Sequence, residues 1–171
     1  MNRMSSTNGN HDKWNPKIIA FFCNWCTYTA ADLAGVSRMK YEPSTRIIRV
    51  MCSGRVDPQH VLKAFSKGAD GVLIGGCHFG DCHYLEGNHK TIRRYYFLKR
   101  IISDMGINPD RLRLEWISAA EGEKVQKVVN DMTQHIRELG PLQIEVDISD
   151  KKEIQSDNTL QTVMEEESAD V

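Results

Sequence analysis

The stretch GVLIGGCHFGDCHYLEGN, residues 71–88, joins a short apolar run to a loop that is dense in reactive side chains. The run Val72–Ile74 is typical of a buried strand. The loop from Cys77 to Asn88 holds two cysteines, two histidines and two acidic residues among two glycines. A turn after an ordinary core strand does not need this chemistry. One interpretation is a polar loop that happens to hold two cysteines. The other is that the loop forms part of a binding site whose remaining ligands come from elsewhere in the chain.

The rest of the chain alternates between strand and helix patterns. Apolar runs predict strands over residues 17–22, 46–51, 72–74 and 112–117, and helical spacing predicts helices over 28–38, 58–67, 89–105 and 119–139. Asp57 and Pro58 are a typical helix start, and Ser118 with Glu121 fits a capping box. This alternation predicts an α/β fold. We expect a single, flavodoxin/Rossmann-like domain with a four-stranded parallel sheet flanked by helices. Residues 142–148 are candidates for a fifth, edge strand or a docking segment.

The two ends of the chain differ from its centre. Residues 1–16 lack the apolar core of a signal peptide, so we interpret them as a flexible leader, followed by the α/β domain over residues 17–141. Residues 142–171 are predicted to be an acidic, largely flexible tail. Positions 145–171 hold nine acids against two lysines, which leaves 20 of the 22 bases and 14 of the 23 acids in the preceding 144 residues.

Composition excludes some classes of protein. The chain of 171 residues is 40% apolar and 26% charged, as in ordinary soluble domains. No apolar run approaches the roughly 20 residues that span a bilayer. The basic residues are scattered and are not interleaved with aromatic ones, which argues against nucleic-acid binding. We therefore expect a cytoplasmic protein that binds neither membrane nor nucleic acid.

All five cysteines follow predicted strands. Cys23 and Cys26 come after the first strand, Cys52 after the second, and Cys77 and Cys82 after the third. In an open parallel sheet these loops leave at the carboxyl edge, where such folds bind ligands. Adjacent strands are only about 4.8 Å apart. The sequence therefore predicts that the thiols converge at this edge.

The chemistry of the thiols stays open on spacing alone. An odd number of cysteines without a secretory signal argues against a disulfide framework. Thiolates select zinc, copper(I) or iron–sulfur clusters, and four suit a structural zinc, a 2Fe–2S or a 4Fe–4S centre. The ample apolar runs weaken the zinc alternative, because structural zinc usually holds together a domain that lacks a core. A dithiol oxidoreductase using Cys23 and Cys26 is the third alternative, and it leaves the other three cysteines without a role.

Five blocks of the sequence resemble the delta subunit of methyl-viologen-reducing hydrogenase. This family is the small iron–sulfur subunit that links hydrogenase to heterodisulfide reductase in methanogens and some relatives. The resemblance covers residues 17–141 and is carried by the blocks CNWCTYTAADLAGVSRMKY (23–41), RIIRVMCSGRVDP (46–58), KAFSKGADGVL (63–73), GCHFGDCHYLEGN (76–88) and RLRLEWISAAEGEKV (111–125).

The resemblance implies a 2Fe–2S cluster and a role as a non-catalytic electron-transfer subunit. It implies a relay of electrons from a hydrogenase or a formate dehydrogenase to the flavin-containing subunit of heterodisulfide reductase, where electron bifurcation in methanogenesis takes place. The family's five cysteine positions are all present, and any four would suffice for the cluster: Cys23, Cys26, Cys52, Cys77 and Cys82.

If the chain is an electron-transfer subunit, other residues near the cysteines are expected to contribute to the site. We expect His78 and His83 to hydrogen bond to cluster sulfur or to exchange protons with a partner, rather than to be ligands. Gly76, like Gly54, would let backbone N–H groups approach sulfur. Arg55 would balance the charge of the thiolates, or is simply a solvated surface charge. No nucleophile–base pair or nucleotide-binding glycine loop is present, as expected for a carrier.

Overall fold

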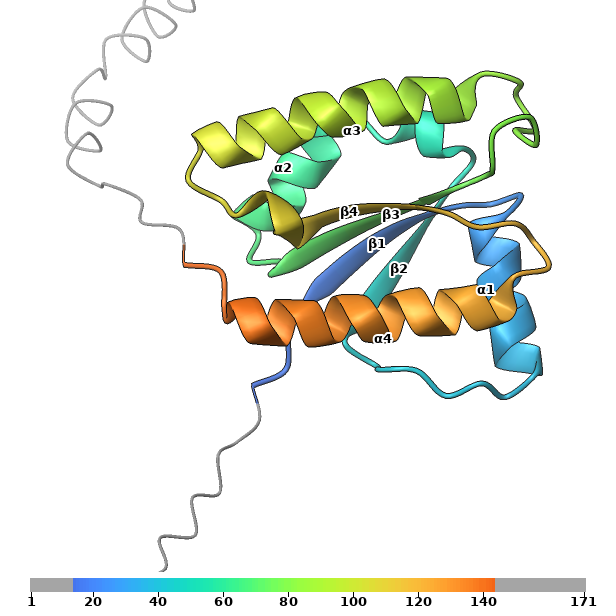
Figure 1. The fold of residues 1–171 in the computed structure, drawn as a ribbon, viewed down its shortest axis with the longest axis horizontal. Helices are drawn as coiled ribbons and strands as arrows, with labels where there is room; N and C mark the ends of the chain where they lie inside the picture. The colour runs from blue at the N-terminus through green and yellow to red at the C-terminus, as the bar shows by residue number, and fades with distance from the viewer. Residues whose placement is uncertain (1–13, 144–171) are drawn as a thin grey trace, which may run out of the picture.

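The computed structural model describes residues 14–143 (Figure 1). Most of the predicted leader and tail therefore lies outside the described residues. Between them, strands and helices alternate in the order β1 (Ile18–Cys23), α1 (Thr27–Val36), β2 (Thr45–Val50), α2 (Pro58–Ser66), β3 (Gly71–Gly76), α3 (Gly87–Asp104), β4 (Leu112–Trp116) and α4 (Gly122–Leu139). Short 3-10 turns, η1 (Ser53–Arg55) and η2 (Pro109–Arg111), precede α2 and β4.

The four strands form one parallel sheet in the order β2-β1-β3-β4. In the register, Phe21 of β1 lies between Ile48 of β2 and Ile74 of β3. The prediction of a four-stranded parallel α/β sheet is confirmed. The chain first adds a strand on one side of β1 and then crosses to the other side, so the strand order reverses at the β1–β3 boundary. This reversal point is where doubly wound folds open a ligand crevice.

Helices cover both faces of the sheet (Figure 1): α2 and α3 lie on one face, and α1 and α4 on the other. Alternate side chains of β1 pack against the helices on the two faces of the sheet, because successive residues of a strand point to opposite faces. Phe21 packs with Val61, Phe65, Leu98 and Ile102 of α2 and α3. Ala20 and Phe22 pack with Ala30, Val125 and Val129 of α1 and α4. The central strands β1 and β3 are therefore buried between two apolar layers.

The helix starts partly match the sequence predictions. The Asp57 carboxylate accepts the Gln59 N–H at 2.9 Å, and Pro58 is the first residue of α2, as expected. Helix α4, however, begins at Gly122 and not at Ala119. The Glu121 carbonyl accepts the first helical hydrogen bond from Val125, so Ser118–Glu121 is a separate turn before the helix. Helix α3 begins at Gly87, two residues before the predicted start.

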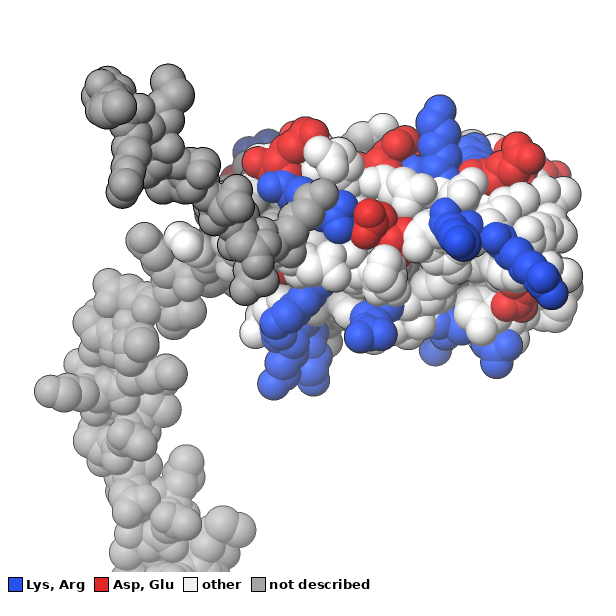
Figure 2. Space-filling view, turned by 90° about the horizontal axis from the view of Figure 1, so that it is seen from below, with Lys and Arg blue, Asp and Glu red and all other residues white. Residues whose placement is uncertain are grey.

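The edges of the described range contact the domain. Trp14 packs against the cluster of Ile18, Met132 and Ile136. Near the other end, the Leu142 N–H donates to the Asp70 carboxylate at 2.9 Å. Figure 2, which looks at the molecule from below, shows basic and acidic side chains intermingled over much of that face, without a broad stripe of one sign. No helix within residues 14–143 combines the length and apolarity needed to cross a membrane.

A buried arginine joins the sheet to the end of α4. One Nη of Arg111 donates to the Asp70 carbonyl at 3.0 Å, and the other donates to the Gly140 carbonyl at 2.9 Å and the Leu139 carbonyl at 3.3 Å. Burial lowers the pKa of Arg111, and the nearby Asp70 carboxylate opposes that shift. The planar guanidinium spans carbonyls that a single ammonium group cannot reach together.

We predict that Arg111→Lys lowers the free energy of unfolding by about 2 kcal/mol, because buried carbonyls lose their donors. Urea unfolding of the metal-free protein measures this loss. Arg113→Lys is the matched control, since the one ion pair of Arg113 within residues 14–143 joins it to Glu115 on the half-exposed edge strand β4. Its expected change is within about 0.5 kcal/mol. Equal stabilities of the two variants would contradict the role given to Arg111.

Candidate metal centre

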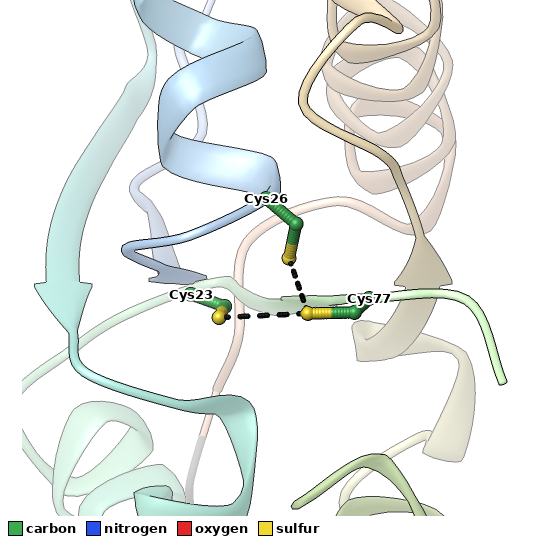
Figure 3. Close-up of side chains that lie close together, drawn as sticks. All are labelled: Cys23, Cys26 and Cys77. Carbon is green, nitrogen blue, oxygen red and sulfur yellow. Dashed lines mark hydrogen bonds between the residues drawn. The ribbon is translucent and has the colours of Figure 1, made fainter. Parts of the chain in front are cut away.

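Three cysteine sulfurs meet at the carboxyl ends of β1 and β3 (Figure 3). Cys23 ends β1, Cys26 lies just before α1, and Cys77 follows β3. The Cys77 Sγ lies 3.0 Å from the Cys26 Sγ and 3.8 Å from the Cys23 Sγ. All three sulfurs lie within 4.8 Å of one another. The predicted convergence of the loops after β1 and β3 is therefore observed, at the point where the strand order reverses.

The remaining two cysteines form a second group beside the first. Cys52 follows β2, and its sulfur accepts the Gly54 N–H at 3.4 Å, as expected for Gly54. Cys52 and Cys82 both lie against Gly87, where an added Cβ would overlap the Cys52 sulfur and come within 3.0 Å of the Cys82 sulfur. Gly87 therefore leaves the space in which these two thiols approach each other.

The thiols are buried and influence one another's ionisation. The exposed fractions run from 1% for Cys23 to 6% for Cys82. Hydrogen bonding from Cys26, and then from Cys77, lowers the pKa of Cys23. Donation to Cys23 in turn raises the pKa of Cys26 and of Cys77, and burial raises the pKa of Cys52. Buried thiols in mutual contact are an arrangement suited to a cation that displaces their protons.

The first turns of α3 hold the cysteine loops in place. The buried Asn88 side chain donates to the His78 carbonyl at 2.9 Å, and the Thr91 hydroxyl donates to Ser53 Oγ at 2.8 Å. Arg94 donates to the Gly54 carbonyl at 2.6 Å. One helix face thus binds the loop after β3 and the loop after β2. It fixes the two thiol-bearing loops relative to each other.

The two histidines contact side chains from other loops. His78 Nε2 lies 2.8 Å from the Glu121 carboxylate. His83 stacks on Trp25 with ring centroids 4.0 Å apart, and the Trp25 N–H donates to the Tyr84 hydroxyl at 3.3 Å. Within residues 14–143, neither histidine makes a hydrogen bond to a cysteine sulfur. Their contacts instead join the loop after β3 to the loops after β1 and β4.

Gly76 packs against neighbouring side chains, and Arg55 lies on the surface. A Cβ at Gly76 would meet the Trp116 ring at 2.7 Å and Ser53 Oγ at 2.8 Å, so this glycine permits close packing of β3 on its neighbours. Arg55 is exposed and lines a cavity of about 290 Å³ next to Cys52 and Tyr84. The cavity lies on the Cys52 side of the thiol group.

Sequence reasoning did not identify several residues that shape the site. Thr27, whose hydroxyl lies 3.5 Å from the Cys26 sulfur, is fully buried at the start of α1. Ser53, Asn88 and Thr91 are buried polar residues that hold the loops. A signal for two of them was present: Asn88 and Thr91 continue the buried face of Leu98 and Ile102 toward the helix start. Polar residues at apolar positions of a helix indicate a local partner.

Together, the doubly wound sheet and the thiols at its carboxyl edge define an α/β domain with a buried cluster of potential metal ligands. A family model described as the delta subunit of methyl-viologen-reducing hydrogenase matches residues 18–140. The chain belongs to this family.

Individual relatives agree with the family match. The iron-sulfur subunit of the vhc F420-non-reducing hydrogenase of Methanococcus voltae is 58% identical over 130 residues, which is 76% of this chain and 90% of that protein. The F420-non-reducing hydrogenase iron-sulfur subunit of Archaeoglobus profundus is 50% identical over 134 residues, 78% of this chain and 98% of that protein. One CoB-CoM heterodisulfide reductase subunit of Methanosarcina acetivorans is 48% identical over 132 residues. That match covers 77% of this chain but 17% of the reductase subunit.

We predict that Glu121→Gln lowers the free energy of unfolding by about 1 kcal/mol at pH 7, because a half-exposed charged acceptor is lost. The Ser118 N–H, and then His78, lower the pKa of Glu121 to about 2. The carboxylate therefore stabilises the fold above its unfolded pKa of about 4.3, and this contribution is lost as the pH falls toward 2. Unfolding of the metal-free proteins at pH 7 and pH 3 should show the gap between wild type and variant shrinking. A gap that widens at pH 3 would contradict the assignment.

Proposed function

We propose that the chain is an electron-transfer subunit with a 2Fe–2S cluster held by four of its five cysteines. It would relay electrons from a hydrogenase or a formate dehydrogenase to the flavin-containing subunit of heterodisulfide reductase, in the cytoplasm. The observation that carries the proposal is the buried group of Cys23, Cys26 and Cys77, with sulfurs within 4.8 Å and two further thiols beside them. Family membership supports it, as do relatives named as iron-sulfur subunits. The heterodisulfide reductase relative, which contains a similar segment within a much longer chain, supports the choice of partner.

The donor set suits such a cluster. Cys23, Cys26 and Cys77 would be three ligands, and the fourth would come from the Cys52–Cys82 pair. When bound, the cluster would supply reversible one-electron transfer. The chain's own contribution is to exclude water from the sulfurs by burial. The Gly54 N–H also donates to the Cys52 sulfur, which is a hydrogen bond of the kind that tunes such centres.

The geometry disfavours the two alternative functions. A dithiol oxidoreductase needs an accessible low-pKa thiol, whereas Cys23 and Cys26 are 1% and 5% exposed, and Cys77 lies against Cys26. A structural zinc is expected where a domain lacks a core, whereas the central strands of this sheet are buried between two apolar layers. The metal content of the purified protein distinguishes both alternatives from an iron–sulfur subunit.

The surface around the thiols suits a protein partner. Large apolar side chains are exposed on the loops that carry the cysteines: Trp25, Met51, Phe79, Tyr84 and Leu85. Exposed apolar groups that gather in one region mark interaction surfaces. An electron carrier with buried ligands needs a partner to approach closely at this edge, and these side chains would provide the contact.

We predict that anaerobically purified protein contains about two irons and two sulfides per chain. Cys23→Ser and Cys77→Ser should each lose most of the iron, because their sulfurs are central to the group. Of Cys52→Ser and Cys82→Ser, one should retain the cluster. Met51→Leu, which changes an exposed sulfur next to Cys52, is the control and should retain full iron content. A colourless protein with one zinc per chain would overturn the proposal.

A second prediction concerns the space at Gly87. Gly87→Ala places a Cβ on the Cys52 sulfur and near Cys82. We expect iron per chain to fall at least several-fold because the Cys52 sulfur must move, and we expect the metal-free fold to lose about 1–3 kcal/mol of stability through overpacking. Gly35→Ala is the matched control, since nothing lies within 4 Å of its added Cβ. Equal iron contents in both variants would show that the Cys52–Cys82 pair is not needed.

A further inference from the structure

An apolar groove runs along the sheet on the α2 side, apart from the thiol group. It has a volume of about 670 Å³ and lies between α2 and the two strands β1 and β2. Its floor is made by the apolar side chains of Ile19, Phe21, Ile48, Val50 and Ala64. Helix α2 packs on β3, so the edge strand β2 is left open on this face, and Ile48 is 44% exposed.

Basic side chains surround the groove. Lys17, Arg46, Lys63 and Lys67 line it together with His60, and no acidic residue does. In the part of the chain that the structure describes, none of the four lysines and arginines forms an ion pair. The groove therefore suits an occupant that is apolar on one face and acidic on the other.

The chain enters its acidic C-terminal segment beside this groove. The Asp70 carboxylate accepts the N–H groups of Leu142 at 2.9 Å and of Lys17 at 2.8 Å. Lys17 lines the groove, as do Gly68 and Ala69 just before Asp70. Leu142 itself lines a neighbouring cavity with Phe65 and Ile107, which shares Gly68 with the groove. The residues after Leu142 therefore start close to one end of the groove, next to the ends of β1 and β3 that lie opposite the thiols.

The sequence of that segment matches the groove. In LQIEVDIS, residues 142–149, the apolar positions Leu142, Ile144, Val146 and Ile148 alternate with Gln143, Glu145 and Asp147. In an extended chain, such alternation places the apolar side chains on one face and the acids on the other. Five extended residues span up to about 18 Å, close to the length of a six-residue strand such as β2.

We propose that residues 144–148 of the same chain dock in this groove, with Ile144, Val146 and Ile148 on the β1–β2 face and Glu145 and Asp147 toward the rim lysines. Burial of the apolar side chains supplies most of the free energy, because exposed ion pairs contribute little and mainly fix the orientation. The attachment at Leu142 gives the segment an effective concentration on the order of millimolar, so an intrinsically weak contact suffices. A free acidic partner lacks this advantage. The docked segment covers the open face of β2 and leaves the thiol edge free.

Hydrogen–deuterium exchange on the anaerobically purified full chain tests the proposal. Peptides over residues 45–50 and 60–69 should exchange several-fold more slowly than in a chain that ends at Gln143. The double variant Lys63→Glu/Lys67→Glu should lose part of the protection in the full-length protein, as should Glu145→Lys/Asp147→Lys, because repulsion replaces the ion pairs that orient the segment. Combining the two pairs should restore part of it. Removal of residues 1–13 and the variant Lys127→Glu on α4 are controls that should leave the protection unchanged.

Three results of the exchange experiment would contradict docking within one chain. Exchange that is the same with and without residues 144–171 would overturn the proposal. Protection that grows with protein concentration would assign the groove to a second copy, and protection confined to residues 112–116 would place the segment on the β4 edge. Either outcome overturns docking within one chain. None of these readouts depends on iron content, so the proposal can fail while the proposed electron-transfer function stands.

Discussion

The structure depends on one constraint, which is that parallel strands end at the same edge of their sheet. The chain adds β2 on one side of β1 and β3 on the other. The loops that leave β1 and β3 must then turn toward opposite helical layers. This divergence opens a space between neighbouring strand ends. Cys23, Cys26 and Cys77 occupy that space, and so the topology alone brings residues from distant parts of the chain within reach of one ligand.

Packing around the thiols fixes the loops that the strand ends bring together. Helix α3 begins with residues that bind the loops after β2 and β3, and only later turns become apolar and cover the sheet. The same helix therefore holds the thiol loops and contributes to the core. Gly87 at its first turn leaves room for the Cys52 and Cys82 sulfurs. Buried thiols that contact mainly one another favour metal binding, because the metal replaces their protons. A metal-binding thiol group is consistent with membership of a family of hydrogenase subunits.

Much of this arrangement was predictable from the sequence, because it follows from strand ends. The apolar runs predicted the strands, and the position of each cysteine after a strand predicted the convergence. Side-chain directions were not predictable: the contact of His78 with Glu121, which comes from the loop after β4, has no signal in the local sequence. The start of α4 was wrong because the Ser118–Glu121 pair forms a turn outside the helix. The spacing of residues in the sequence predicts neither the contact of His78 nor the start of α4, since both depend on packing between distant parts of the chain.

The central claim is that the converging sulfurs hold a two-iron cluster. X-ray absorption at the iron edge of anaerobically prepared full-length protein measures it most directly. The account predicts iron surrounded by sulfur alone, with one neighbouring iron atom in the next shell. Nitrogen or oxygen ligands on the iron, or mononuclear iron without an iron neighbour, would contradict it.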